Sequence, residues 1–445
     1  MLDRIKKYID EHSLLNKKNL HLVALSGGAD SVCLLRVMLQ LGYNVHAIHC
    51  NFHLRGEESN RDEEFCKTLC SNLNVTLHLA HFDTLAYAEQ HKVSIEMAAR
   101  DLRYAYFEQL RQAIVADDIV VAHHKDDNVE TVIMNLVRGT GLNGLQGIKP
   151  RNGRIIRPML QVTRKEITDY LAVLKQDFVT DSTNLVDDVT RNKIRIKIIP
   201  ILKEINPAVI ENISHTIENI KEVSKIVEEA TKNSIRQCIK KNADGTITLN
   251  RKLLLEQTSP EHTLYAIIKD YGFSPQQTKL IFENIDAPSG KVWRSNTHTI
   301  ASDREVFIIF KSLDDGYGKM VKLPVEGTYC IYNDQVHIQV RTEKRKKDFV
   351  PSREKYNVTL DADRVSFPLT IRSVSHGDRF YPYGMKGTKL VSDYLTDRKA
   401  NHYEKIKQLI VEDAKGEIIW LVGERTSNKA ACSDNTINIL HLRYM

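Results

Sequence analysis

The sequence predicts an N-terminal α/β domain built on a parallel sheet, a small, mainly helical middle domain and a small α+β C-terminal domain. Strand-like apolar runs alternate with helical patterns in the first half, as in parallel sheets with helices on both faces. A long helical pattern follows, and short strand-like runs return near the end. A chain of 445 residues is also too long for a single core. We therefore expect domains at residues 1–215, 216–325 and 326–445.

The elements of the first domain follow from the spacing of its apolar residues. Continuous apolar runs predict buried strands, whereas apolar positions three or four apart predict helices that bury one face. The predicted strands lie at 20–25, 44–50, 75–79 and 118–122. The predicted helices lie at 32–39, from about 62, at 95–113 and at 128–137. Ligands of such sheets bind at the carboxyl ends of the strands, so polar residues there are site candidates.

Beyond Pro207, apolar residues recur at helical spacing to about residue 236 and predict one long helix with an apolar face. Short helices are expected within 250–285, and strands within 293–310 and 417–422. The apolar face of the long helix packs either on its own domain or on a second subunit, so a homodimer is left open.

Composition restricts the class of protein. The 63 Lys and Arg residues exceed the 57 Asp and Glu residues by six, a mild lean toward an anionic partner. Seven scattered cysteines without a Cys-x-x-Cys pair argue for a reducing compartment and against a zinc ribbon. No apolar run approaches the roughly 20 residues of a membrane span, and the acidic residues among the first 15 do not suit a signal peptide. We expect a cytoplasmic protein that does not enter a membrane.

A Ser/Gly loop joins the first predicted strand to the first predicted helix. Two adjacent glycines let the backbone approach a ligand, and the loop N–H groups with the helix start make an anion site. The loop lacks the Gly-Lys-Ser/Thr ending of a Walker motif. Asp30 beside a phosphate implies a bridging cation, so we interpret it as a magnesium ligand. The candidate phosphate-binding residues are Ser26, Gly27, Gly28, Ala29, Asp30 and Ser31.

A second polar cluster opens the helix after the fourth predicted strand. It contains His124, Asp126, Asp127 and Glu130. Carboxylates at a helix start stabilise the helix dipole, which is the purely structural alternative. Asp127 and Glu130 are one turn apart and could instead project into the crevice of the glycine loop. There they would bind magnesium, bind a cationic substrate or act as a base.

Basic side chains near these segments are candidates for phosphate or RNA contact. Arg55 follows the second strand, and its planar guanidinium suits phosphate oxygens. Arg100 and Arg103 share one helix face, which is either solvated or directed at phosphates. Further candidates occupy a second glycine-rich turn and a basic helix start, namely Arg138, Gly139, Arg191 and Arg195.

Near the C-terminus, cations and aromatic residues are interleaved with glycines between residues 377 and 395. Arg379, Lys386 and Lys389 are the cations of this segment. The pattern suits contact with an RNA backbone combined with stacking on bases. The alternative is a glycine-rich loop with packed aromatic side chains.

These segments together resemble one enzyme family. SGGADS, HCNFHLRGEES, AARDLRY, HHKDDNVET, RGTGLNGL, RPML, DSTN and RNKIR are similar, in order, to the N-terminal domain of tRNA(Ile)-lysidine synthases. That domain belongs to the PP-loop ATP pyrophosphatases, with an adenine nucleotide alpha hydrolase-like fold. The segment from Gly377 also resembles the C-terminal domain of the longer synthases. One departure is Asn128, where the family often has Gln, and it leaves both carboxylates in place.

The resemblance implies an activity and a set of partners. ATP would activate the wobble cytidine of a tRNA(Ile) with a CAU anticodon, and L-lysine would then replace the oxygen at carbon 2. The products would be lysidine-bearing tRNA, AMP and pyrophosphate, and the tRNA would switch from methionine to isoleucine identity. By the same resemblance, the middle domain would bind substrate and the C-terminal domain would bind tRNA.

Residue roles follow from the charge that this reaction develops and from the proton that the lysine amine must lose. Asp30, Asp127, Glu130 and Arg100 are the expected catalytic residues, with Mg²⁺ on Asp30 and Glu130. Whether Asp127 or Glu130 is the base stays open. The glycine loop with Arg55, Arg138 and Gly139 would bind ATP. The substrate-binding set is His124, Asp126, Arg103, Arg191, Arg195, Arg379, Lys386 and Lys389.

Two other functions fit part of the sequence. A PP-loop enzyme that thiolates tRNA usually carries reactive or cluster-ligating cysteines, often as Cys-x-x-Cys, and this chain has no such pair. A tRNA-binding protein without catalysis would gain nothing from carboxylates beside phosphates. The synthase hypothesis requires that Asp30 and Glu130 lie on the same side of the sheet.

Overall fold

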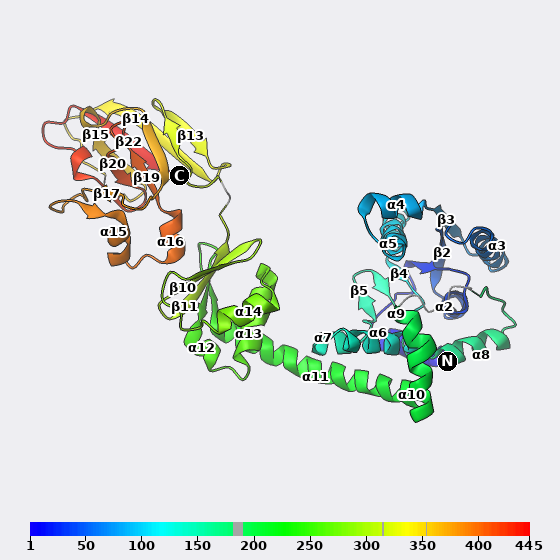
Figure 1. Cartoon of the computed structure of the whole chain (residues 1–445). Helices are drawn as coiled ribbons and strands as arrows, with labels where there is room; N and C mark the ends of the chain where they lie inside the picture. Colours follow the sequence, from blue (N-terminus) through cyan, green and yellow to red (C-terminus); the bar gives the residue numbers. More distant parts are fainter. Residues whose placement is uncertain (181–189, 314–315, 353) are drawn as a thin grey trace. The chain divides into compact units, whose positions relative to one another are not determined.

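The structure is a computed structural model that describes residues 1–180, 190–313, 316–352 and 354–445 (Figure 1). The chain divides into two compact units, which we call the N-terminal unit (Met1–Val227) and the C-terminal unit (Glu228–Met445). Helix α11 (Val209–Cys238) is the long helix predicted after Pro207, and it contains this division. The predicted boundary at residue 215 lies inside α11, and the division into three domains stays a prediction.

The N-terminal unit is built on a six-stranded sheet with strand order β3-β2-β1-β4-β6-β5. Strands β5 and β6 pair antiparallel, and the other neighbours pair in parallel. The predicted α/β class with a parallel sheet is therefore confirmed. The strands are β1 (Leu20–Ala24), β2 (Asn44–Asn51), β3 (Leu77–His81), β4 (Asp118–Val120), β5 (Arg151–Asn152) and β6 (Ile155–Ile156).

Helices cover both faces of this sheet. On β1, Leu22 packs with Phe107 and Ile119 in one buried cluster, whereas the next residue, Val23, packs with Leu34 in another. Because neighbouring residues of a strand point to opposite faces, this strand is buried on both sides. The helices are α1 (Leu2–Glu11), α2 (Ala29–Gln40), α3 (Glu57–Asn72), α4 (Thr84–His91), α5 (Ile95–Ala113), α6 (Lys125–Val137), α7 (Leu142–Leu145), α8 (Arg164–Val173), α9 (Thr190–Lys193), the π-helix η2 (Ile194–Ile198) and α10 (Ile199–Ile205).

Local capping explains where element ends differ from the sequence pattern. The third strand begins at Leu77 rather than at 75, because Val75 still donates its N–H to Cys70 O at the end of α3. Helix α6 begins before residue 128, because the Asp127 carboxylate accepts the His124 N–H at its start. Helix α4 was not predicted, and Asp83 caps it by accepting the Ala86 N–H.

The middle region, the first part of the C-terminal unit, combines short helices with an antiparallel sheet of order β7-β8-β11-β10-β9. Leu249, Leu264 and Phe307 are fully buried between the sheet and the helices. The strands predicted within 293–310 are present. The elements are β7 (Ile239–Lys241), β8 (Ile247–Asn250), α12 (Arg251–Leu255), α13 (Pro260–Ile268), η3 (Lys269–Tyr271), α14 (Pro275–Phe282), β9 (Val292–Arg294), β10 (His298–Asp303) and β11 (Val306–Lys311).

The rest of the C-terminal unit packs two antiparallel sheets, β12-β16-β19-β20-β21 and β13-β14-β22-β15, around Trp420, with a two-stranded ribbon β17-β18. This is the predicted α+β region. Across the described residues, every helix is too short or too polar to traverse a lipid bilayer. The elements are β12 (Val321–Leu323), β13 (Gly327–Ile331), β14 (Val336–Lys344), β15 (Asn357–Asp361), η4 (Ala362–Arg364), β16 (Leu369–Ser373), β17 (Arg379–Phe380), β18 (Lys389–Leu390), α15 (Val391–Asp397), α16 (His402–Lys407), β19 (Leu409–Glu412), β20 (Ile418–Leu421), β21 (Arg425–Thr426), η5 (Asn428–Ala430) and β22 (Asn438–Tyr444).

Candidate nucleotide site and acidic cluster

The glycine loop leaves β1 and enters α2 through a backbone turn that favours glycine. Gly27 has φ +88°, a left-handed conformation that side chains rarely adopt. Its carbonyl accepts the Val179 N–H at 2.9 Å, and Gly28 forms a parallel bridge with Val179. The segment around Val179 therefore holds the glycine loop in place.

The two serines of the loop have different roles. Ser31 is buried, its hydroxyl donates to Gly28 O at 2.9 Å, and its oxygen accepts the Ser26 N–H at 3.1 Å. Ser26 is exposed, and its hydroxyl lies 3.1 Å from that of Ser31. Ser31 thus braces the loop, while Ser26 offers a hydroxyl to a ligand.

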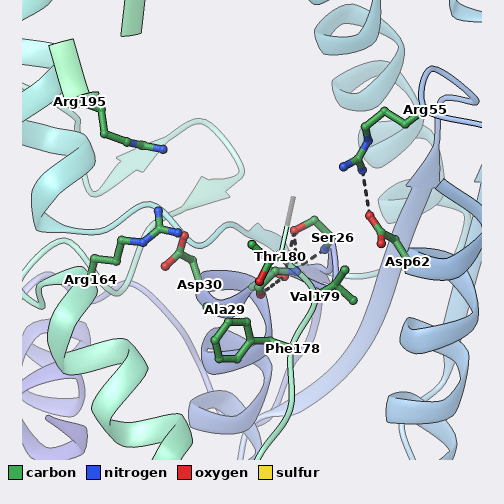
Figure 2. Close-up of a pocket in the computed structure, with 12 residues that line it drawn as sticks. Ser26, Ala29, Asp30, Arg55, Asp62, Arg164, Phe178, Val179, Thr180 and Arg195 are labelled. Atoms are coloured by element: carbon green, nitrogen blue, oxygen red, sulfur yellow. Dashed lines mark hydrogen bonds and ion pairs between the residues drawn. The ribbon is translucent and has the colours of Figure 1, made fainter. Parts of the chain in front are cut away.

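A polar cavity of about 280 Å³ opens at this loop (Figure 2). Arg55, Arg164 and Arg195 reach it from three other parts of the chain, so three cations line the cavity at the glycine loop. Arg55 also pairs with Asp62 at 2.9 Å. The lining residues are Ser26, Gly28, Ala29, Asp30, Ser31, Arg55, Asp62, Arg164, Phe178, Val179, Thr180 and Arg195.

Sequence reasoning did not identify the wall formed by Phe178, Val179 and Thr180. The sequence signal that could have indicated this wall is the strand-like character of these three residues, just before Asp181-Ser182-Thr183-Asn184. The bridge between Gly28 and Val179 could not be read from the sequence, because the two residues are far apart in the chain. The DSTN motif itself lies outside the described residues.

His124 lies at the centre of the acidic cluster. Its imidazole Nε2 is 3.6 Å from Asp30 and 3.4 Å from Asp127, and its Nδ1 is 3.5 Å from Asp126. Burial would lower the pKa of His124, but the carboxylates of Asp126, Asp30 and Asp127 outweigh burial and raise it to about 10. His124 is therefore a cation at neutral pH, and it connects the glycine loop to the start of α6.

Asp126 contacts neighbouring protein groups and does not line the cavity. Its carboxylate accepts the Arg164 N–H at 2.9 Å. Burial opposes ionisation, yet the contact with His124 and this backbone hydrogen bond lower the pKa of Asp126 to about 2. Asp126 thus holds the start of α8 and balances the charge of His124.

Glu130 anchors Arg195. The Arg195 Nε donates to Glu130 Oε1 at 2.6 Å, and its Nη2 donates to Oε2 at 2.8 Å and to Asp127 at 3.3 Å. Arg191 is 3.4 Å from Glu130 and donates to Thr131 at 2.6 Å. Burial raises the pKa of Glu130, and the Arg195 charge offsets part of that rise.

The structure thus brings Asp30 and Asp127 to one histidine, while Glu130 is connected through Arg195. Asp30 both lines the cavity and contacts His124, so the cavity and the acidic cluster are continuous. The side chain of Asp127 is 14% exposed and that of Glu130 only 2%. Of the two, Asp127 is the more accessible to a substrate.

Some predicted residues do not line this cavity. Among the described residues, the lining includes neither the buried Gly27 nor the exposed pairs Arg138 with Gly139 and Arg100 with Arg103. The guanidinium groups of Arg100 and Arg103 lie 5.1 Å from the rings of Tyr104 and Phe52, respectively.

The predicted residues of the C-terminal segment belong to the other unit. Arg379 and Lys386 are exposed, and Lys389 forms an ion pair with Asp397. The neighbouring Asp378 accepts two hydrogen bonds from Arg372, at 2.8 and 3.1 Å. The acidic residue of this segment is therefore structural, whereas two of its cations face solvent.

Comparison with known proteins gives matches along the whole chain. Residues 1–202 match the family of PP-loop domains, and residues 241–312 match the TilS substrate binding domain. The tRNA(Ile)-lysidine synthase of Parabacteroides distasonis is 40% identical over 446 residues and covers 100% of both chains. That of Bacteroides thetaiotaomicron is 40% identical and covers 98% of both chains.

A solved structure titled as the TILS C-terminal domain is 26% identical, with a TM-score of 0.26, and covers 29% of this chain and 96% of that chain. The full-length identity to synthases from two organisms, together with an ATP-using PP-loop domain at the N-terminus, shows the family. The chain belongs to the tRNA(Ile)-lysidine synthase family.

Proposed function

We propose that this protein uses ATP and Mg²⁺ to attach L-lysine to carbon 2 of the wobble cytidine of tRNA(Ile) with a CAU anticodon. The single observation that carries the proposal is the position of Asp30, which belongs both to the cavity of the glycine loop and to the carboxylate cluster around His124. A nucleotide held by the loop would react beside carboxylates that can receive an amine.

The first step is the transfer of an adenylyl group to the RNA. The cytidine O2 attacks the α-phosphorus, and pyrophosphate leaves. The backbone N–H groups of the loop, the Ser26 hydroxyl and the guanidinium groups of Arg55 and Arg195 supply donors for the phosphate oxygens. Arg195 is fixed by Glu130, so its charge is in place before the reaction starts.

The contacts of Asp30 fit a magnesium ligand. Its Oδ1 atom is buried, accepts no hydrogen bond within the described part of the chain and lies 3.6 Å from His124 Nε2, so this oxygen can still coordinate a cation. Mg²⁺ bound there would neutralise charge on the pyrophosphate leaving group. Glu130 as a second magnesium ligand stays a prediction. Both of its oxygens accept hydrogen bonds from Arg195, so Mg²⁺ would have to compete with this arginine.

The second step replaces the activated oxygen by lysine. The amine attacks carbon 2, the C2–O2 bond breaks, and AMP leaves with the oxygen. We assign the incoming ammonium group to Asp127, and the same carboxylate receives the proton that the amine loses. Burial opposes ionisation of Asp127, but the charges of His124 and Arg191 lower its pKa, so an anion is ready for the cation.

The C-terminal unit would contribute to tRNA binding. Arg379 and Lys386 are exposed beside the half-buried ring of Tyr381 and the exposed ring of Tyr383. Exposed cations suit the RNA backbone, and aromatic rings suit unpaired bases. Lys389 is a weaker candidate because its ammonium group already pairs with Asp397.

The cysteines favour this reaction over thiolation. Cys33, Cys66 and Cys70 are buried, and burial raises the pKa of Cys33 to about 12 and that of Cys70 to about 11. Such thiols are poor nucleophiles at neutral pH. All seven cysteines are free thiols, and we place the reaction in the cytoplasm. A homodimer remains a prediction that sedimentation would test.

The decisive assay incubates the protein with ATP, labelled lysine and a transcript of tRNA(Ile) carrying CAU. The proposal requires label in RNA together with AMP and pyrophosphate. The transcript of methionine tRNA with the same anticodon is the matched control and should stay unlabelled. ATP use without lysine transfer would instead support another tRNA modification, and neither signal would leave a binding protein.

A further inference from the structure

A second cavity, of about 350 Å³, lies at the carboxyl ends of the parallel strands, as the glycine loop does. Phe52 and His53 follow β2, His81 ends β3, and Phe82 follows it. Asn51 and His81 pair in register between these parallel strands, which brings the two strand ends together. The remaining lining residues are Asp83, Thr84 and Leu85, none of which lines the ATP cavity within the described residues.

The cavity is lined by a pair of stacked phenyl rings and a pair of near-parallel imidazole rings, which are joined by a hydrogen bond between His53 Nε2 and His81 Nδ1 at 3.0 Å. The rings of Phe52 and Phe82 are 5.5 Å apart at 22°, and those of His53 and His81 are 5.1 Å apart at 18°. His53 and His81 are exposed, and Leu85 at the rim is 59% exposed. Aromatic and imidazole rings that meet solvent in a hollow make a platform on which a base can stack.

Charged groups complete the cavity. The guanidinium group of Arg103 lies over the Phe52 ring at 5.1 Å, and Arg100 lies one helical turn away; both are exposed. Cations beside a stacking platform suit the phosphates of a single strand. Asp83 caps α4 and also lines the cavity, so its carboxylate offers an acceptor for the exocyclic amino group of a base.

We propose that Phe52, His53, His81 and Phe82 bind an unpaired base of the tRNA by stacking, with Arg103 on the adjoining phosphate. The inference rests on the proposed function, because it takes tRNA as the substrate. It also gives Arg103, which the sequence predicts to bind substrate, a specific contact on the RNA. RNA is favoured over the adenine of ATP because the glycine-loop cavity has its own aromatic residue, Phe178, and because the exposed Arg103 lies against Phe52 of the second cavity.

The test uses two double variants of the full chain. F52L/F82L keeps apolar volume but removes the phenyl faces, and H53Q/H81Q changes only exposed rings, so it leaves the core intact. His91→Gln is the matched control, since His91 is also an exposed imidazole stacked on an aromatic ring, that of Tyr87 at 4.0 Å, outside the cavity. Circular dichroism confirms folding of each variant.

Two quantities are measured for each protein. The first is the Kd of a fluorescein-labelled anticodon stem-loop RNA with a CAU loop, by titration without ATP. The second is the KM for ATP in AMP release with full-length tRNA. We expect the stem-loop Kd to rise about fivefold or more in F52L/F82L, as for the loss of one base–aromatic stack, and by a smaller factor in H53Q/H81Q. The KM for ATP should stay within about twofold, and His91→Gln should match wild type.

Unchanged RNA binding in both double variants would overturn the proposal. A higher KM for ATP with unchanged RNA binding would overturn it as well, because the cavity would then hold the adenine. The titration needs no turnover, so its result is independent of lysine transfer. A wild-type protein that transfers no lysine but loses RNA binding in F52L/F82L refutes the proposed function and leaves this site standing.

Discussion

The two units hold their functional cations in opposite ways. In the N-terminal unit, Arg195 is fixed by Glu130 and Asp127, with distances between 2.6 and 3.3 Å. In the C-terminal unit, Arg379 and Lys386 are exposed on and beside a short ribbon. An anchored cation stabilises charge at one point, whereas exposed cations attract a polyanion wherever it lies. Substitutions in the first unit should therefore affect the rate of reaction, and those in the second should affect affinity.

The largest effect is expected from Asp30→Ala. Asp30 is the residue shared by the cavity and the acidic cluster, and its loss removes the proposed magnesium ligand. AMP release should fall by about three orders of magnitude, while the Kd for tRNA stays within about twofold. Quenched-flow analysis of AMP and filter binding measure the two quantities. The control Asp101→Ala removes an exposed carboxylate of α5 and should leave both unchanged. Wild-type turnover by Asp30→Ala would refute the role of Asp30.

Glu130 and Arg195 should behave as one functional group. Glu130→Ala leaves Arg195 without its main anchor and should cost only about 1 kcal/mol of stability, since a guanidinium group that is 25% exposed can reach solvent. Each single substitution should lower the rate of AMP release about 100-fold, and the double substitution should be no worse than either.

A double-mutant cycle on AMP release, with thermal unfolding in parallel, measures this coupling. Glu108→Ala, which breaks the Glu108–Arg111 ion pair at 2.6 Å away from the site, is the control. Multiplicative losses in the double variant would show that Glu130 acts independently of Arg195, as a base or a metal ligand.

The C-terminal cations sharpen the comparison through salt dependence. Arg379→Ala and Lys386→Ala should each raise the KM for tRNA about threefold at low salt. Each should also reduce the slope of log KM against log salt concentration by about one. The kcat should not change, because these residues lie outside the reacting cavity. Lys389→Ala is the matched control, since its ammonium group is already paired with Asp397, and its effect should be smaller. A fall in kcat at constant KM would contradict a role in affinity alone.

The smallest effect concerns pH and His49, which is buried behind the glycine loop with its Nδ1 2.9 Å from Leu25 O. Burial lowers the pKa of His49, although the Leu25 carbonyl and the charge of Glu63 act in the other direction. Below pH 6.5 the unfolded chain therefore binds a proton that the folded chain does not. The contribution of His49 to the free energy of unfolding is therefore complete above pH 6.5. It declines as the pH falls from 6.5 toward the lowered pKa that His49 has in the folded protein.

Nuclear magnetic resonance titration of the His49 ring should give a pKa below 6.5. The melting temperature should also drop less between pH 7.5 and 5.5 in His49→Gln than in the wild type. A folded-state pKa above 6.5 would reverse the sign of this effect.

The sequence predicted those parts of the site that depend on local pattern. The glycine loop, the acidic start of α6 and the strand ends that position them follow from strand, loop and helix signals within a few residues of each other. It did not predict the Glu130–Arg195 pair or the wall at Val179, because those contacts join segments far apart in the chain. The contact between Arg103 and the Phe52 ring could not be predicted from the sequence for the same reason.

The central claim is that the adenylyl group of the ATP bound in the glycine-loop cavity is transferred to RNA before lysine reacts. The direct measurement incubates the protein with full-length tRNA(Ile) carrying CAU and ATP labelled on its α-phosphate, without lysine. The account predicts label in the tRNA, and its release as AMP when lysine is added. AMP that forms without tRNA, or a tRNA that stays unlabelled while lysine is still incorporated, would contradict it.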